Sequence, residues 1–111
     1  MPATDATGTL AVSGTSVLRL GGHADFDTTV AGLGRGYVYV TVVCVQGATV
    51  VYQWSKRPDE VELSFPLVDQ AGQGLEWSGG PARGIARLVH RIDGRKPVIR
   101  TLAEVQFEVE G

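Results

Sequence analysis

Three side chains at alternate positions, His23, Asp25 and Asp27, are of types that could bind a metal. On a β-strand all three would project from one face, and imidazole and carboxylate groups both bind divalent cations. A metal site needs about four ligands from converging elements. Nothing in the sequence brings the only other histidine, His90, close to these three. We therefore favour a polar outer strand face, with no metal and no cofactor.

Nucleophilic chemistry would have to use the single cysteine, Cys44. This residue lies within an apolar run, where burial would disfavour the reactive thiolate. The chain has no Gly-x-Ser-x-Gly elbow, and the glycines at 79 and 80 lack the Lys and Ser/Thr of a phosphate-binding loop. We find no catalytic set, so the sequence predicts a protein that is not an enzyme.

Basic residues gather in one short region, at Arg83, Arg87, Arg91, Arg95, Lys96 and Arg100. Binding of nucleic acid would require unneutralised charge interleaved with stacking aromatic residues. No aromatic residue lies within this region, and the acidic Glu104, Glu108 and Glu110 follow it. We expect a salt-bridged sheet face that binds no nucleic acid and on which Arg83, Arg87 and Arg91 could contact a protein partner.

Five aromatic residues could anchor a binding surface, namely Tyr37, Tyr39, Tyr52, Trp54 and Trp77. Aromatic side chains are enriched in interface hot spots, but small sandwiches also bury them in the core. Trp77 lies in a glycine-rich stretch, where it could be either a lid over the end of the core or an exposed anchor.

The hydrophobic pattern that must position these residues has a period of two. The run 37–45 is almost wholly β-branched or aromatic, which predicts a central strand. Strands are also expected around 10–12, 24–30, 50–54, 61–67, 83–92 and 104–110, with a shorter one near 17–20. The expected core consists of Val38, Val40, Val42, Cys44, Leu63, Phe65, Ala86, Leu88, Val105, Phe107 and Val109.

Three details of these strands can be tested. Pro66 near the end of 61–67 predicts a strand at a sheet edge, because proline cannot donate to a central ladder. The Asp93–Gly94 dipeptide marks the turn of the last hairpin. A tight turn would place Arg87 opposite Arg100, whereas a longer loop would pair Arg87 with Glu108 and Arg91 with Glu104. Opposite charges across strands are stabilising, so we prefer the longer loop.

A chain of 111 residues suits one domain, and 43% apolar with 20% charged residues is ordinary globular usage. Fifteen glycines between short β-branched runs favour many turns. We predict an all-β, immunoglobulin-like sandwich of about seven antiparallel strands over 9–111, after a flexible arm of residues 1–8. No apolar stretch is long enough to cross a membrane, and no signal peptide is evident at the N-terminus.

Three stretches together resemble a family of small proteins from phages of actinobacteria and from their hosts. They are HADFDTTVAGLG followed by YVYVTVVCVQG, then Trp77 to Ala82 leading into Ala86-Arg87-Leu88, and last Arg100 to Glu104 with Phe107 and Gly111. The resemblance covers nearly the whole chain. It implies an immunoglobulin-like sandwich, with several members encoded among virion structural genes.

In that family the cysteine matching Cys44 commonly has a second cysteine as partner, at the position of Gly84 here. The resemblance implies that the pair would bridge the facing sheets. With glycine at that position the bridge cannot form, and we expect Cys44 to be a free, buried thiol.

The resemblance implies a structural protein of a phage virion, in first place a decoration protein that binds the capsid surface. The expected partners are capsid or tail subunits, with homo-oligomers possible and no membrane. The expected location is the virion if the chain is phage-encoded, and otherwise the cytoplasm. The alternative is a carbohydrate- or receptor-binding module of a tail or host protein, in which Trp54, Trp77 and the tyrosines would form a stacking platform.

Overall fold

The computed structural model describes residues 6–13, 18–32, 34–58, 62–77 and 79–110. It is an all-β protein, as predicted. The elements in chain order are β1 (Thr7–Val12), β2 (Leu18–Arg19), β3 (His23–Ala31), β4 (Tyr37–Gln46), β5 (Thr49–Lys56), β6 (Ser64–Pro66), the 3-10 turn η1 (Ala71–Gln73), β7 (Ala82–Ile92) and β8 (Val98–Glu110). No helix in the described part of the chain is long and apolar enough to span a membrane.

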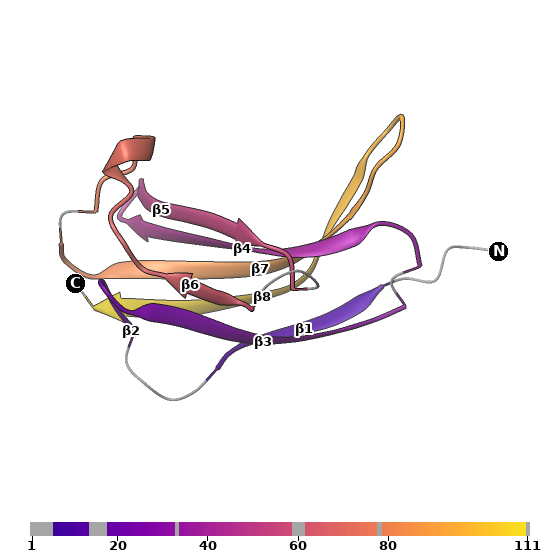
Figure 1. The fold of residues 1–111 in the computed structure, drawn as a ribbon, viewed down its shortest axis with the longest axis horizontal. Helices are drawn as coiled ribbons and strands as arrows, with labels where there is room; N and C mark the ends of the chain where they lie inside the picture. Colours follow the sequence, from indigo (N-terminus) through magenta and orange to yellow (C-terminus); the bar gives the residue numbers. More distant parts are fainter. Residues whose placement is uncertain (1–5, 14–17, 33, 59–61, 78, 111) are drawn as a thin grey trace.

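The strands form two layers that are visible in Figure 1. One sheet has the order β1-β3-β6, and the other has the order β2-β8-β7-β4-β5. All described pairs are antiparallel except β2 with β8, which is parallel and covers only two residue pairs. The described chain thus has eight strands rather than about seven, and its sheets are not purely antiparallel.

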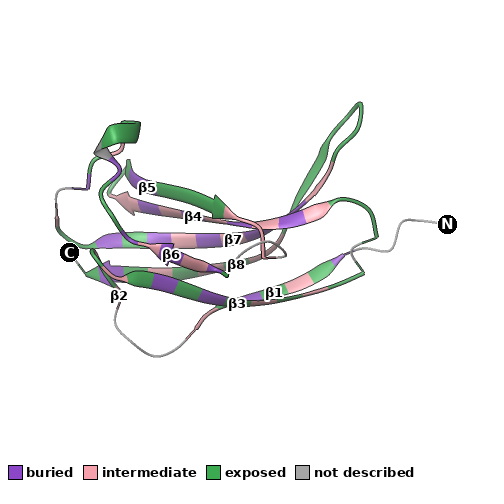
Figure 2. Ribbon diagram, viewed as in Figure 1, coloured by how far each residue is buried: buried purple, intermediate pink, exposed green. Residues whose placement is uncertain are grey.

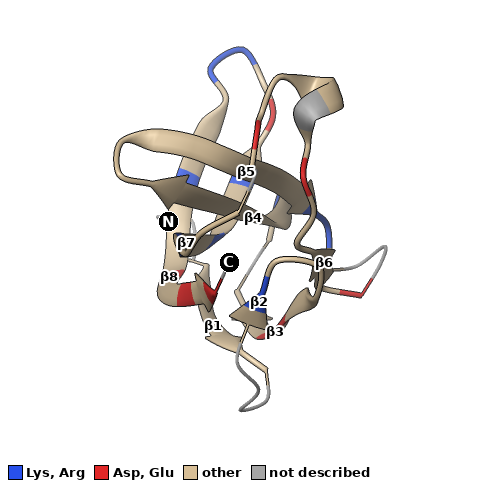
Figure 3. Cartoon of the chain, turned by 90° about the vertical axis from the view of Figure 1, so that its left-hand side faces the viewer, with Lys and Arg blue, Asp and Glu red and all other residues tan. Residues whose placement is uncertain are grey.

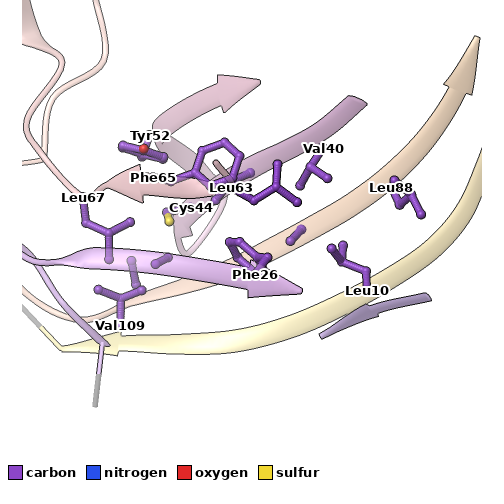
Figure 4. Packing of buried hydrophobic residues seen from close by; sticks show 14 of the residues in the cluster. Leu10, Phe26, Val40, Cys44, Tyr52, Leu63, Phe65, Leu67, Leu88 and Val109 are labelled. Carbon is purple, nitrogen blue, oxygen red and sulfur yellow. The ribbon is translucent and has the colours of Figure 1, made fainter. Parts of the chain in front are cut away.

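The core lies between the two layers, because each strand turns alternate side chains inward. In β4 the even-numbered residues Val38, Val40, Val42 and Cys44 are buried. Figure 4 shows two of them, Val40 and Cys44, on the side of β4 that faces the opposite sheet with Phe26 and Phe65. Phe26 packs edge-on against both Phe65 and Phe107, with ring centroids 5.6 Å apart in each pair. Figure 2 shows the resulting alternation of buried and exposed positions along the strands.

The other expected core residues divide into two groups. Leu63, Phe65, Ala86, Leu88 and Val109 are buried. Val105 and Phe107 are only half-buried and pack against the edge of the core. They lie on β8, which has a full neighbour on one side only, so their outer parts stay accessible.

The N-terminal boundary differs from the expected one. Ala6 is buried and β1 begins at Thr7, so the end of the expected arm belongs to the folded domain. Residues 1–5 lie outside the described residues.

Strand β6 lies at the edge of its sheet, because it pairs with β3 alone. This agrees with the edge position predicted from Pro66.

The strand register of the last hairpin differs from both predicted alternatives. A five-residue loop joins Ile92 to Val98, longer than a tight turn. Arg87 lies opposite Glu104 rather than Glu108, and Arg83 lies opposite Glu108. The register shifts by one residue after Leu88, and this bulge together with the intermediate loop length produces a register that neither alternative contained.

The resemblance implied that positions 44 and 84 lie on facing sheets, and the structure corrects this. Cys44 and Gly84 lie directly opposite each other in β4 and β7, which are neighbouring strands of one sheet. A bridge between these positions would therefore not join facing sheets. Cys44 is a free, buried thiol, as expected.

Candidate interaction surface

The outer face of the five-stranded sheet collects most of the residues expected to contact a partner. In β4 the odd-numbered residues Tyr37 and Tyr39 point away from the core, and both are half-buried. In β7 the residues opposite this series also point outward, and they include Arg83, Arg87 and Arg91. Five of the eight predicted contact residues thus share one sheet face, although they are spread over fifty-five positions of the sequence. Tyr52, another of the eight, is fully buried in the core.

The two tyrosines form the aromatic part of this face. Their ring centroids lie 6.2 Å apart, and the guanidinium carbon of Arg57 lies 4.5 Å from the centroid of Tyr37. Tyr37 is also directly opposite Arg91. Cations stack favourably on aromatic faces, so Arg57 stabilises the position of the half-buried Tyr37 ring.

Ion pairs form the charged part of the face. Arg87 Nε lies 2.7 Å from Glu104 Oε1, and Arg83 Nε lies 3.8 Å from Glu108 Oε1. Arg91 Nε donates a hydrogen bond to Asp93 Oδ1 at 2.8 Å, which raises the pKa of this arginine further above its ordinary value. These arginines have acidic partners within the chain, so the face offers alternating charges and not the unneutralised basic groove that binds nucleic acid.

Apolar side chains lie among these groups in the same outward-facing series of β4 and β7. Val89 is opposite Tyr39, whereas Val43, Val45 and Ile85 lie beyond the Thr41–Arg87 pair. Val89 is buried although it faces outward, and it pairs with Thr101 of β8 and with Tyr39 of β4. The sequence did not predict that these apolar side chains lie on the outer face. A continuous β-branched run is equally typical of a strand that is buried on both faces.

Trp77 does not belong to this surface, and of the two roles that the sequence left open the structure shows the lid and not the exposed contact. Its side chain is 1% exposed and packs edge-on against Tyr52, with ring centroids 6.3 Å apart. The indole Nε1 donates to the carbonyl of Gly80 at 3.1 Å, and the backbone N–H donates to Asp69 Oδ1 at 3.1 Å. Both hydrogen bonds fix the loop over the end of the core, so Trp77 is the lid.

Trp54 is exposed but lies on the opposite side of its sheet from the tyrosines. It pairs with the core residue Val42, and its side chain is 37% exposed because β5 is an edge strand. The ammonium group of Lys56 lies 5.7 Å from the Trp54 centroid and donates to the carbonyl of Ser64 at 2.5 Å. The two tryptophans and the tyrosines therefore do not form one stacking platform.

Gln70 provides an edge contact that the sequence did not indicate. Its side-chain Oε1 accepts from the Gln53 N–H, and its Nε2 donates to the Gln53 carbonyl, both at 2.9 Å. The side-chain amide thus occupies the place of a neighbouring strand beside β5. Exposed strand edges invite pairing with other chains, and this contact covers part of one.

The groups considered for chemistry lie apart from one another. His23, Asp25 and Asp27 are exposed on one face of β3, whereas Cys44 is fully buried, and this burial raises the pKa of its thiol to about 12. Among the described residues, no three His, Cys, Asp or Glu side chains are grouped so that they could hold a metal.

A hollow of about 290 Å³ lies where β4 ends and β7 begins. It is lined by Val45, Gln46, Gly47, Pro81, Ala82, Arg83 and Glu108.

Gln46 closes one side of that hollow. Its Nε2 donates to the carbonyl of Gly79 at 2.8 Å, with the carbonyls of Gly80 and Pro81 each at 3.2 Å. The amide nitrogen therefore holds the Trp77 loop to β4. This arrangement makes Gln46 a structural residue.

Comparison of the chain with protein-family models, with curated proteins and with solved structures gave no match.

Proposed function

We propose that this protein is a structural and interaction domain that binds a protein partner through the outer face of its five-stranded sheet. The observation that carries the proposal is the joint placement of Tyr37, Tyr39 and the Arg87–Glu104 pair on that face. Aromatic residues and arginine are the types most enriched at interface hot spots. Apolar side chains of β4 and β7 lie beside these groups on the same face, and protein interfaces combine apolar contacts with polar groups in this way.

The partner we propose is the shell of a phage particle, with the domain as a decoration protein on the capsid surface. The support for this partner is the resemblance of three sequence stretches to virion-associated proteins of actinobacteriophages. An ordered lattice presents the same site many times, so a domain that binds this site would be present in many copies on each particle.

We further propose that the sandwich is immunoglobulin-like. The order β8-β7-β4-β5 corresponds to strands G-F-C-C′ of variable-type domains, and β1-β3-β6 corresponds to A-B-E. In this arrangement the surface formed by β4 and β7 is the C–F face. The fold alone supports no particular function, because such sandwiches serve many roles.

The test is the composition of purified particles from the source, measured by mass spectrometry and by electron cryo-microscopy. We expect the protein in hundreds of copies on the shell, with the β4–β7 face toward it. A few copies would move the protein to the tail. Absence from the particles would overturn the virion role.

A binding assay with the full chain tests which face of the domain binds, separately from the identity of the partner. The double variant Tyr37→Ser/Tyr39→Ser should lose binding to particles stripped of the protein while retaining its fold. Trp54→Ala is the matched control, since it removes an exposed aromatic side chain from the other side of the sheet. Binding to a glycan array that depends on the two tyrosines would instead support the carbohydrate-binding alternative.

A further inference from the structure

The hairpin between β7 and β8 extends beyond the body of the sandwich, as Figure 1 shows. Its returning strand carries Val98 and Ile99, which are 47% and 55% exposed, the highest values among the large apolar side chains described. Neighbouring residues of a strand point to opposite faces, so the hairpin is apolar on both sides. Burial of such a stem requires another molecule, because it projects away from its own domain.

The tip of this hairpin is positively charged. Arg95 and Lys96 are exposed, and among the described residues neither takes part in an ion pair. Figure 3 shows the tip as a blue segment. The hairpin therefore combines an apolar stem with two uncompensated cationic groups, in contrast to Arg83, Arg87 and Arg91 on the body.

The same chain carries a surface of complementary chemistry. A hollow of about 380 Å³ lies beside β3 and is lined by Asp25, Phe26, Glu62, Leu63 and Ser64. Phe26 and Leu63 supply apolar lining, and Phe26 N–H donates to the Leu63 carbonyl at 3.0 Å. Asp25 and Glu62 are exposed and form no ion pair within the described part of the chain.

We propose that the hairpin of one copy docks on this hollow of a second copy. Arg95 and Lys96 would meet Asp25 and Glu62, while Val98 or Ile99 would cover the apolar lining beside Phe26 and Leu63. The hairpin points away from its own body, so the contact forms between copies (Figure 1). Each copy carries both surfaces at different places, so two copies can exchange hairpins reciprocally, or copies can join head-to-tail in a ring or a chain of subunits.

This contact between copies is independent of the β4–β7 face proposed above to bind a partner. The occupant we favour is a second copy, because the charges of the two surfaces are opposite and both are uncompensated within the described chain. Electrostatic contacts of this kind weaken with salt, since ions screen exposed charges beyond about 10 Å at 0.1 M.

The experiment is sedimentation velocity on the full chain over a range of protein concentrations at low and at high salt. We expect concentration-dependent association that salt weakens. The variant Arg95→Glu/Lys96→Glu and the variant Asp25→Lys/Glu62→Lys should each weaken it by about tenfold or more. A wild-type protein that stays monomeric throughout, or association that neither reversal changes, would overturn the proposal.

A mixture of the two reversed variants provides the decisive arm. In the mixture each hairpin again finds a hollow of opposite charge, so association should return although neither variant associates alone. Failure of the mixture to associate would contradict the proposed pairing. Glu76→Lys is a matched control for Glu62→Lys, since it makes the same charge change at an exposed position outside the hollow. Val98→Ser/Ile99→Ser should also weaken association without lowering the melting temperature.

Discussion

The ring of Phe107 on β8 lies over the backbone of Gly84 on β7, in the space that a Cβ atom on residue 84 would occupy. The two residues are direct neighbours across the strands. Glycine in a strand interior weakens the strand, but here the missing side chain admits an aromatic ring that also packs against Phe26. The glycine at this position is thus required by the packing of Phe107.

Substitution Gly84→Ala should lower the free energy of unfolding by about 1–3 kcal/mol, because the added methyl group overlaps the Phe107 ring and forces it or the backbone to move. Thermal and denaturant unfolding would measure the loss. Gly94→Ala is the control, since a Cβ there meets nothing within 4 Å.

The cause of that loss can be isolated in a double-mutant cycle. Phe107→Leu removes the ring, so Gly84→Ala should cost much less in that background than in the wild type. Equal costs in the two backgrounds would show that Phe107 is not the reason for glycine at residue 84.

Gln70→Ala should remove both hydrogen bonds to Gln53 and leave this part of the β5 edge uncovered. We expect a loss of about 1–3 kcal/mol, since each hydrogen bond contributes about 0.5–1.5 kcal/mol. We also expect an increased tendency to aggregate through the open edge, measured by light scattering. Gln73→Ala, at an exposed position of η1, should change neither property. Unchanged stability of Gln70→Ala would contradict the role of Gln70 as an edge cover.

Trp77→Ala should be among the most damaging single substitutions, with an expected cost of about 3–5 kcal/mol for the cavity that it leaves. The loop hydrogen bond to Gly80 would be lost as well. Trp77→Phe should retain most of the packing and cost less. A near-neutral effect of Trp77→Ala on urea unfolding would be incompatible with its place in the core.

Much of the fold could be predicted from the sequence because apolar and polar side chains alternate with a period of two along its strands. The alternation in β4, with even residues buried, follows directly from the run of β-branched side chains. The edge position of β6 followed from Pro66, a residue that cannot donate to a second neighbour. Local chemistry was sufficient in both cases.

The errors came from bulges and from contacts between distant segments. The register of β4 with β5 shifts after Cys44, so that the consecutive residues Val51 and Tyr52 are both buried, which a strict period of two cannot predict. The bulge after Leu88 likewise decided which glutamate faces Arg87. The burial of Trp77 depends on a loop that folds over Tyr52, and no local pattern contains that information.

The residues of the candidate surface could be chosen from the sequence by their type, but their arrangement could not be predicted. Tyr37 and Arg91 are over fifty positions apart in the sequence and become neighbours only through the pairing of β4 with β7. Trp54 has the same residue type as a hot-spot anchor, yet the register with Val42 places it on the other side of the sheet. Strand pairing, which is non-local, therefore determined which of the predicted residues form one surface.

The buried thiol of Cys44 predicts a loss of stability at alkaline pH. Burial raises its pKa from the ordinary value of 9.0 to about 12, because the anion would lose its hydration. Below pH 9 the thiol is protonated in both the folded and the unfolded chain, so the full stability is present. Between pH 9 and about 12 only the unfolded chain releases the proton, and stability falls by up to about 1.4 kcal/mol for each pH unit.

The measurement is the free energy of unfolding as a function of pH for the wild type and for Cys44→Val, which keeps an apolar side chain of similar size and has no proton to release. Tyr52 is also buried with a raised pKa, so the variant should retain part of the slope above pH 10. The slope between pH 9 and 10 should be flatter in Cys44→Val than in the wild type. A thiol reagent should modify wild-type Cys44 only under unfolding conditions, and rapid modification of the native protein at neutral pH would show that the thiol is accessible.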